Sequence, residues 1–217
     1  MNATRKSKYY FNPPLLLKKM FPNFIWNSPC GKIVLTFDDG PNPKTTPLIL
    51  KILEKNNADA IFFTVGENLA RHKTLANEII EHGHTLGNHA QNHAVLTRLK
   101  KKEIIKQISL VQNFARDELN YEIKFFRPPH GRFPINLAKT LNLFGLKNVM
   151  WSLLTYDYEN NFNMVKFAIE NFLRQDSIVV FHDNDKSAEI IEESLNYLFE
   201  KASEKGFEFG KVAECLK

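Results

Sequence analysis

Two adjacent carboxylates, Asp38 and Asp39, follow the apolar run 33–37 and precede a Gly-Pro pair. At a tight turn both side chains can converge on one site, although neighbouring carboxylates repel unless a cation or an arginine neutralises one of them. A metal ion bound by Asp39 would leave Asp38 available as a general base. An Asp-Asp-Gly-Pro string is also ordinary turn chemistry, so this pair alone does not distinguish a catalytic site from a plain turn.

Two histidines, His89 and His93, are four positions apart, and this spacing places both imidazoles on one face of a helical turn. With one carboxylate they form the donor set of a catalytic divalent-metal site, typically zinc. The spacing alone is only moderately specific, because most surface histidines bind nothing. His82 and His84 are interpreted as structural residues near a helix end and at a strand start.

Three further ionisable residues, Arg127, Asp157 and His182, have types that suit proton-transfer chemistry. Arg127 precedes a stiff Pro-Pro turn and can orient a carboxylate base through paired hydrogen bonds. The loop 129–131 can bring a backbone N–H to a developing oxyanion. His182 can protonate a leaving amine, with Asp157 holding its imidazole charged. The competing interpretations are a surface arginine in a loop and a core histidine bonded to the backbone.

The elements that must position these residues alternate between strand and helix. Short apolar, β-branched runs indicate strands, and helical periodicity indicates helices. Strands are predicted over 33–37, 60–65, 85–86, 123–126, 147–151, 177–181 and 207–209, and helices over 45–56, 67–81, 103–119, 135–144, 163–173 and 188–204. The alternation predicts an α/β fold: a distorted, incomplete, TIM-like (β/α)7 barrel in a single domain over 32–217, with 1–31 as an arm packed on it. A doubly wound open sheet is the alternative.

Each of the candidate groups comes after a predicted strand. In a parallel β/α barrel these positions lie on one rim, at the C-terminal ends of the strands, where active sites form. Five different strands carry an ionisable group in this position. The sequence therefore predicts one site assembled from distant parts of the chain.

The composition limits the class of protein and its partners. The chain has 217 residues, of which 43% are hydrophobic and 24% charged, as in ordinary globular proteins. Its net charge of +5 is mild, and no basic run interleaves with aromatic residues, so nucleic acid is not an expected partner. Cys30 and Cys215 fit no metal or redox spacing and are interpreted as two unpaired thiols.

No apolar run approaches the roughly 20 residues of a membrane span, and no secretory signal is recognised. The expected location is therefore the cytoplasm or the inner membrane surface. The apolar and basic segment 15–24 can contact a membrane peripherally. The oligomeric state does not follow from the sequence.

Five motifs occur in the order and approximate spacing typical of one known family. The chain resembles the polysaccharide deacetylases, the NodB-homology or carbohydrate esterase family 4 group, over about residues 32–215. The motifs are Thr36-Phe37-Asp38-Asp39-Gly40-Pro41, His89-x-x-x-His93, Arg127-Pro128-Pro129-x-Gly131, Trp151 through Asp157, and Val180-Phe181-His182-Asp183. The resemblance implies the same kind of barrel and a zinc-type metal bound by Asp39, His89 and His93. It also implies a base at Asp38 oriented by Arg127, and an acid at His182 whose pKa Asp157 tunes.

The implied reaction is metal-assisted hydrolysis of N-acetyl groups on an amino-sugar glycan, such as peptidoglycan or a chitin-like oligosaccharide, with release of acetate. An O-acetyl esterase using the same site and a non-catalytic carbohydrate-binding domain are the alternatives. No expected ligand or proton-transfer residue is lost. The departures from the family pattern therefore bear on substrate and metal affinity; they are Ala90, His130, Leu154 and Tyr158.

Overall fold

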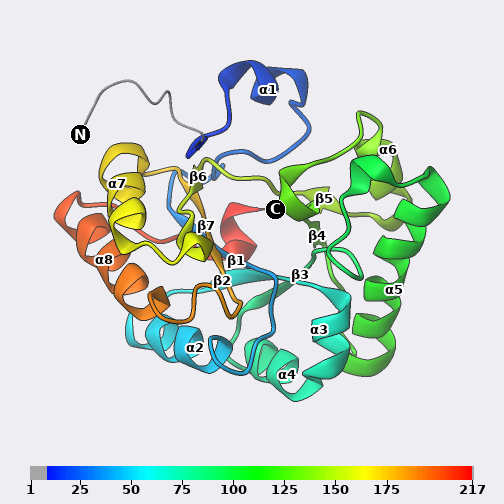
Figure 1. Ribbon diagram of the computed structural model, residues 1–217, viewed down its shortest axis with the longest axis horizontal. Helices are drawn as coiled ribbons and strands as arrows, with labels where there is room; N and C mark the ends of the chain where they lie inside the picture. The colour runs from blue at the N-terminus through cyan, green and yellow to red at the C-terminus, as the bar shows by residue number, and fades with distance from the viewer. Residues whose placement is uncertain (1–8, 217) are drawn as a thin grey trace.

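A single curled sheet of seven parallel strands forms the centre of the computed structural model, which describes residues 9–216. The order across the sheet is β5-β4-β3-β2-β1-β7-β6. Helices surround the strands, as Figure 1 shows. The predicted distorted, incomplete (β/α)7 barrel is confirmed. The strands are β1 (Val34–Asp38), β2 (Ala60–Thr64), β3 (Thr85–Asn88), β4 (Phe125–Phe126), β5 (Lys147–Asn148), β6 (Leu153–Leu154) and β7 (Ile178–His182).

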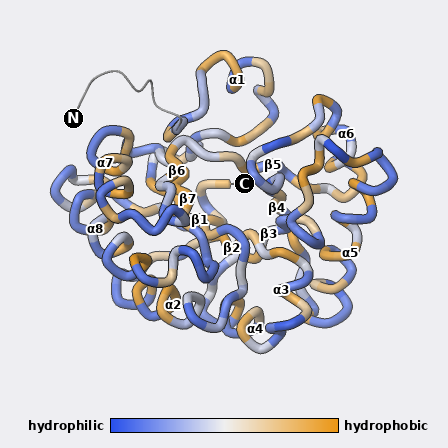
Figure 2. The backbone as a smooth tube through the Cα atoms, in the orientation of Figure 1, coloured by the Kyte–Doolittle hydropathy of each residue, from blue (hydrophilic) through white to orange (hydrophobic). Residues whose placement is uncertain are grey.

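The helices cover the outside of the barrel because each has one apolar stripe. In α5, for example, Ile104, Ile108, Val111 and Ala115 recur at helical spacing and are buried. Figure 2 shows hydrophilic and hydrophobic stretches alternating along the outer helices. The α-helices are α1 (Leu15–Met20), α2 (Thr46–Lys55), α3 (Gly66–Arg71), α4 (Lys73–Glu81), α5 (Lys101–Leu119), α6 (Leu137–Leu141), α7 (Phe162–Phe172), α8 (Ile191–Glu204) and α9 (Val212–Cys215). None of the helices between residues 9 and 216 is long and apolar enough to cross a membrane.

Several of the predicted elements differ in the structure. The predicted helix 67–81 is interrupted at His72, whose φ of −123° and ψ of 47° separate α3 from α4. The predicted strand 207–209 is wrong, because its one β-contact is an isolated bridge between Phe209 and Ile33. The seventh strand is instead β6, which pairs with β7.

The segment 147–154 links the two edges of the sheet, and this explains why the strand predicted over 147–151 is short. β5 pairs with β4 at one edge, and β6 pairs with β7 at the other. Between them, Met150 N–H donates to the carbonyl of Ile25 at 2.8 Å, and Ser152 N–H donates to the carbonyl of Ile178 at 3.1 Å. The chain leaves one ladder and joins another within a few residues, so no single strand spans the segment.

The N-terminal arm packs against this same junction. Ile25 forms a parallel bridge with Val149. Leu154 N–H donates to the carbonyl of Phe11 at 2.8 Å. Phe11, Phe24 and Trp26 are buried in the main core cluster. The boundary between arm and domain at residue 31 stays a prediction, and residues 1–8 of the arm lie outside the described residues.

Helix α9 fills the barrel at the N-terminal ends of the strands. Its Val212 and Cys215 pack in one cluster with Val34 at the start of β1 and Ile178 at the start of β7. In Figure 1 it lies near the centre of the ring of helices. The opposite end of the barrel, where the strands end, is left for the candidate site.

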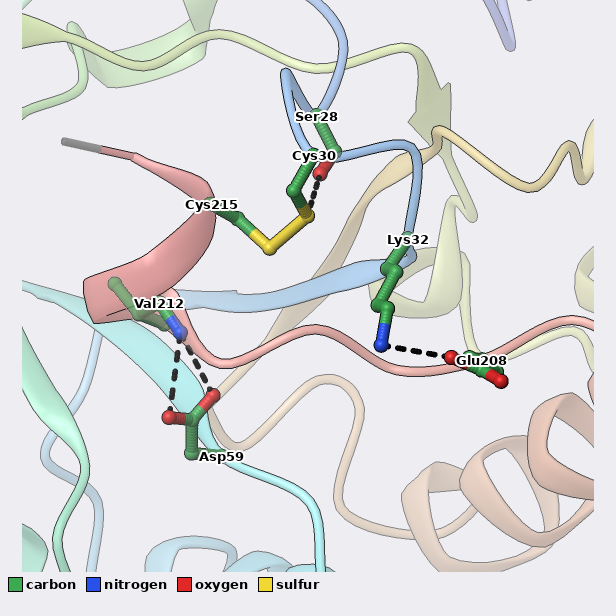
Figure 3. Close-up of a disulfide and its surroundings, with 7 residues drawn as sticks. All are labelled: Ser28, Cys30, Lys32, Asp59, Glu208, Val212 and Cys215. Carbon is green, nitrogen blue, oxygen red and sulfur yellow. Dashed lines mark hydrogen bonds and ion pairs between the residues drawn. A yellow bond between two sulfur atoms is a disulfide. The ribbon is translucent and has the colours of Figure 1, made fainter.

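A disulfide joins Cys30 to Cys215, so the expectation of two unpaired thiols is wrong. The two cysteines are 185 positions apart, and no local pattern in the sequence signals their pairing. Pairing follows from the fold: Gly210 N–H donates to the carbonyl of Ile33 at 2.8 Å, and this contact brings the two ends together. Figure 3 shows the disulfide between the loop before β1 and helix α9.

Candidate active site

Asp38 and Arg127 form a buried ion pair inside the barrel. Side chains alternate along β1, so Asp38 faces the same side as Thr36, while Phe37 packs in the core outside the sheet. Arg127 Nη1 donates to Asp38 Oδ1 and to Thr36 Oγ1, each at 2.7 Å. The guanidinium is completely buried. Its position fixes one carboxylate oxygen of Asp38.

The other guanidinium nitrogens of Arg127 donate to the chain that crosses the barrel opening. Nε donates to the carbonyl of Val149 at 2.9 Å, and Nη2 donates to the carbonyl of Met150 at 2.7 Å. The guanidinium carbon lies 4.2 Å from the ring centre of Phe63. Arg127 therefore orients Asp38 as a rigid part of the barrel interior.

Asp39 has a left-handed backbone, with φ of +81°, and is held at two points. Asn68 Nδ2 donates to its carbonyl oxygen at 2.8 Å, and Asn184 Nδ2 donates to its Oδ2 at 2.7 Å. Its Oδ1 is buried, and among the described residues it has no hydrogen-bond partner. A buried carboxylate oxygen without a donor is expensive unless something positive binds it.

His89 and His93 approach this unpartnered oxygen. Their Nε2 atoms lie 3.7 Å and 3.1 Å from Asp39 Oδ1. The residues between them do not form the helical turn expected from their spacing. Ala90 and His93 instead have φ of +63° and +54°, so a loop of unusual backbone conformation brings the two rings together.

The three side chains fit a divalent metal ion. His89 Nδ1 lies 2.8 Å from the carbonyl of Arg127, and this contact fixes the ring with Nε2 directed at Asp39. Burial lowers the pKa of His89 to about 4, so its imidazole is neutral at neutral pH, as a metal ligand must be. One carboxylate oxygen and two imidazole nitrogens within 4.8 Å of one another suit zinc and related ions. The identity of the metal stays a prediction.

The pKa of Asp39 is lowered, and it is therefore ionised at neutral pH. Burial opposes ionisation, but the positive charge of His182, followed by the two other histidines, outweighs it. Because His89 is neutral at neutral pH, His182 supplies the main part of this effect.

His182 and Asp157 form a second buried pair. His182 Nδ1 lies 2.7 Å from Asp157 Oδ1, and Asp157 Oδ2 accepts the backbone N–H of His182 at 2.7 Å. Burial alone would lower the pKa of His182, but the charge and hydrogen bond of Asp157 raise it to about 9. The imidazole is therefore protonated at neutral pH. Because Asp157 binds Nδ1, the proton on Nε2 is the one that His182 can donate.

One cavity of about 430 Å³ joins these groups at the C-terminal end of the barrel. Asp38, Asp39, His89, His93 and His182 all line it. Arg127 and Asp157 are fully buried behind it, in contact with Asp38 and His182. The structure therefore brings together all seven candidate residues, while their individual roles stay predictions.

The loop 129–131 also lines this cavity through His130 and Gly131. Pro129 has no N–H, and the amides of Gly131 and Arg132 donate to the carbonyls of Pro128 and Pro129. His130 is thus the residue of this loop whose amide can serve an oxyanion. Its φ of +58° turns the backbone at this point.

Asn184 was missed by the sequence reasoning, and Asp183, although part of the last quoted motif, was given no role there. Asn184 holds Asp39, as described above. Asp183 is buried, accepts hydrogen bonds from Thr45 Oγ1 and Thr46 Oγ1, and lies so close to Gly40 that a Cβ there would come within 2.0 Å of its carboxylate. Burial raises the pKa of Asp183 to about 7. Both residues directly follow His182 in the sequence, and this position was the available signal.

The comparison with known families agrees with this geometry. The family model described as polysaccharide deacetylase matches residues 27–149. The chain belongs to the polysaccharide deacetylase family. The resemblance in the sequence motifs is thereby confirmed.

Individual relatives of this deacetylase-family chain support the same assignment. A peptidoglycan-N-acetylglucosamine deacetylase of Bacillus cereus is 30% identical over 213 residues, covering 94% of this chain and 98% of the relative. The peptidoglycan-N-acetylglucosamine deacetylase PgdA of Listeria monocytogenes is 31% identical over 84% of this chain, but the match spans only 38% of that longer protein. The crystal structure of the Bc1960 peptidoglycan N-acetylglucosamine deacetylase superposes with a TM-score of 0.84 at 26% identity, covering 89% of this chain and 92% of the other.

Proposed function

We propose that this chain is a metal-dependent hydrolase that removes N-acetyl groups from an amino-sugar glycan and releases acetate. The substrate class is peptidoglycan or a chitin-like oligosaccharide. The names of the relatives reported above support peptidoglycan. The observation that carries the proposal is one cavity lined by a carboxylate base, a protonated histidine and a metal-type donor set.

Each residue has a distinct part in the proposed reaction. A divalent ion held by Asp39, His89 and His93, with zinc the expected ion, would polarise the acetyl carbonyl and acidify water. Asp38 takes the proton of the attacking water at Oδ2, because Arg127 already occupies Oδ1.

The developing negative charge and the leaving amine need two further groups. The backbone amide of His130 donates to the oxygen that becomes negative. His182 then gives its Nε2 proton to the sugar nitrogen as acetate leaves, while Asp157 keeps the imidazole oriented through Nδ1.

The test is acetate release from N-acetylated oligosaccharides of peptidoglycan and of chitin, with and without a chelator. We expect release that a chelator abolishes and added zinc restores. Asp38→Asn is the matched control, because it should lose turnover by a factor of about 10² to 10⁴ and still bind zinc. Release that a chelator leaves unchanged would contradict the metal dependence, and equal loss of zinc in Asp38→Asn and Asp39→Asn would contradict the division of roles.

An O-acetyl esterase is the second candidate for the same site, since its chemistry differs only in the leaving atom. The charged state of His182 favours the amide reaction, because a sugar amine needs a proton to leave and an alkoxide or phenoxide needs it less. Acetate release from matched N-acetyl and O-acetyl glycans separates the two. Absence of release from both, with zinc bound, would leave the carbohydrate-binding alternative.

Peripheral contact with a membrane through 15–24 also stays a proposal. Leu15, Leu16 and Met20 are exposed at 75%, 71% and 63%, beside the basic Lys19. Such a surface suits the interface of an anionic bilayer. Sedimentation with phosphatidylglycerol vesicles, compared with the variant Leu16→Ser, tests this contact.

The location in the cytoplasm or at the inner membrane surface likewise stays a prediction from the sequence. The Cys30–Cys215 disulfide favours an oxidising compartment, because cytosolic reductants keep most thiols reduced. Thiol labelling of the protein immediately after cell lysis distinguishes the cytoplasm from an oxidising compartment. Labelled cysteines would support the cytoplasm.

A further inference from the structure

A second cavity, of about 420 Å³, lies next to the candidate active site. The two cavities share one wall, which is formed by His130, Gly131, Arg132, Trp151, Leu154 and Tyr158. The N-terminal arm supplies the other wall through Tyr10, Pro13, Pro14, Leu17 and Trp26. We call this second cavity the arm groove. All five residues of this arm wall precede residue 27, where the match to the family model begins.

The arm wall is held in place by the chain that carries Asp157. Tyr10 N–H donates to Tyr156 Oη at 2.9 Å, and the same hydroxyl donates to the Tyr10 carbonyl at 3.3 Å. Tyr9 and Phe11 each pack edge-on against the ring of Tyr156, at 4.9 Å and 5.1 Å between centroids. The groove is therefore a preformed surface, and binding to it requires little ordering of the arm.

The groove presents aromatic faces together with polar edges. Tyr10 is 69% exposed. The rings of Trp26, Trp151 and Tyr158 also line the groove. Trp151 Nε1 is buried, and among residues 9–216 it has no hydrogen-bond partner. A pyranose ring has the matching features: a flat apolar C–H face and polar hydroxyl groups at its edge.

We propose that the arm groove binds the sugar units next to the one that is deacetylated. The proposal rests on the proposed function, because the occupant is inferred from continuity with the active-site cavity. A polymeric substrate extends beyond the sugar at the metal site, and the arm groove adjoins the active-site cavity through the shared residues. The arm thus makes the chain selective for oligomers over single sugars.

The decisive variant is Tyr10→Ala. The hydrogen bonds that fix the arm at this position use backbone atoms of Tyr10, so the substitution removes the exposed ring and keeps the anchor. Leu143→Ala is the control, because Leu143 is 65% exposed and lines neither cavity. kcat/KM is measured on N-acetylglucosamine, the single sugar, and on its pentamer.

We expect the wild-type chain to have a higher kcat/KM on the pentamer than on the single sugar. Tyr10→Ala should lower kcat/KM on the pentamer by about three- to tenfold, the range for one aromatic contact, and leave the single sugar unchanged. Leu143→Ala should change neither. Equal effects of Tyr10→Ala on the single sugar and the pentamer, or no effect on either, would overturn the proposal while leaving the deacetylase function intact.

An alkyl chain is the competing occupant of an apolar groove. Octyl N-acetylglucosaminide therefore serves as a second substrate. Suppose that the octyl group raises kcat/KM above that of the single sugar and that Tyr10→Ala removes this gain, while the pentamer has no higher kcat/KM than the single sugar. That combined result would mean that the groove binds lipid and that the proposal is wrong.

A direct binding measurement separates the proposal from the proposed function. Tryptophan fluorescence of the Asp38→Asn variant, with and without Tyr10→Ala, is titrated with the pentamer. Weaker binding in the double variant supports the groove even if no acetate is ever released, and equal binding overturns it.

Discussion

Asp39 depends on neutral side chains for its position. Asn184 occupies its Oδ2, so Oδ1 remains as the atom that faces the two histidines. We expect Asn184→Ala to weaken zinc binding by about 10- to 100-fold, the usual cost of losing a residue that orients a metal ligand. Competition with a zinc-sensitive dye measures this affinity without any turnover.

The control for this prediction is Asn171→Ala. Asn171 is exposed on α7, and its side chain donates to the carbonyl of Phe167 in the same helix. It should bind zinc like the wild-type chain. Wild-type affinity in Asn184→Ala would show that Asp39 is positioned by its backbone alone.

His182 sets the alkaline limit of the proposed reaction. The charge of Asp157 raises its pKa to about 9, so the acid form is present below that pH and activity falls as pH rises through it. Asp157→Asn removes the charge and leaves the burial, which lowers the pKa. The alkaline limb of kcat/KM should therefore move to lower pH, with zinc content unchanged.

A second substrate checks that the limb belongs to proton donation. The aryl oxide of an activated ester leaves without needing a proton. Hydrolysis of such an ester should therefore keep its rate at the pH where the amide reaction fails. An alkaline limb that stays in place in Asp157→Asn would assign it to another group.

At the scale of single residues, the charged part of the site was predictable and the neutral part was not. Asp38, Arg127 and His182 were recognised because ionisable groups follow strand ends. Asn68 and Asn184 carry no charge and occur in no recognised spacing, so only the folded loops reveal that they hold Asp39.

Helix α5 supports the loop that carries the metal-type histidines. Gln107 Oε1 accepts the backbone N–H groups of Gln91 at 3.0 Å and Asn92 at 3.2 Å. The loop has two residues with positive φ and cannot bond to itself as a helix would. An outer helix of the barrel thereby fixes the backbone between His89 and His93.

Gln107→Ala should loosen this loop. We expect a several-fold loss of zinc affinity and faster amide hydrogen exchange at Gln91 and Asn92, because two backbone N–H groups lose their acceptor. Ser109→Ala, on the exposed side of the same helix, is the control. Unchanged exchange at both amides would contradict the prediction.

At the scale of elements, periodicity predicted the long helices and the buried strands well. It failed where pairing depends on distant partners. Leu153–Leu154 becomes a strand because β7 lies beside it. The segment 207–209 does not, because its pairing is confined to one isolated bridge between Phe209 and Ile33. Helix α9, which fills one end of the barrel, was not predicted because its four residues are too few to show a period.

The whole molecule is cross-linked near both ends by Cys30 and Cys215, which close a loop with a sequence separation of 185. The double variant Cys30→Ser, Cys215→Ser should lower the free energy of unfolding by about 2–5 kcal/mol. Urea unfolding with and without reductant measures this, and reductant should have no effect on the double variant. Neither cysteine lines the active-site cavity, so kcat should stay unchanged.

The strand order also has a consequence for how the chain is made. β1 lies between β2, its immediate successor, and β7, which comes about 140 residues later. A ribosome therefore releases Asp38 and both metal-type histidines well before the strand that ends at His182. Until β7 emerges, one side of β1 presents unpaired backbone groups, a template for pairing with other chains. A nascent chain halted before Ile178 would carry the metal-type donors without the acid His182, on a sheet that is prone to aggregate. Both the solubility of the chain and its proposed chemistry therefore require β7.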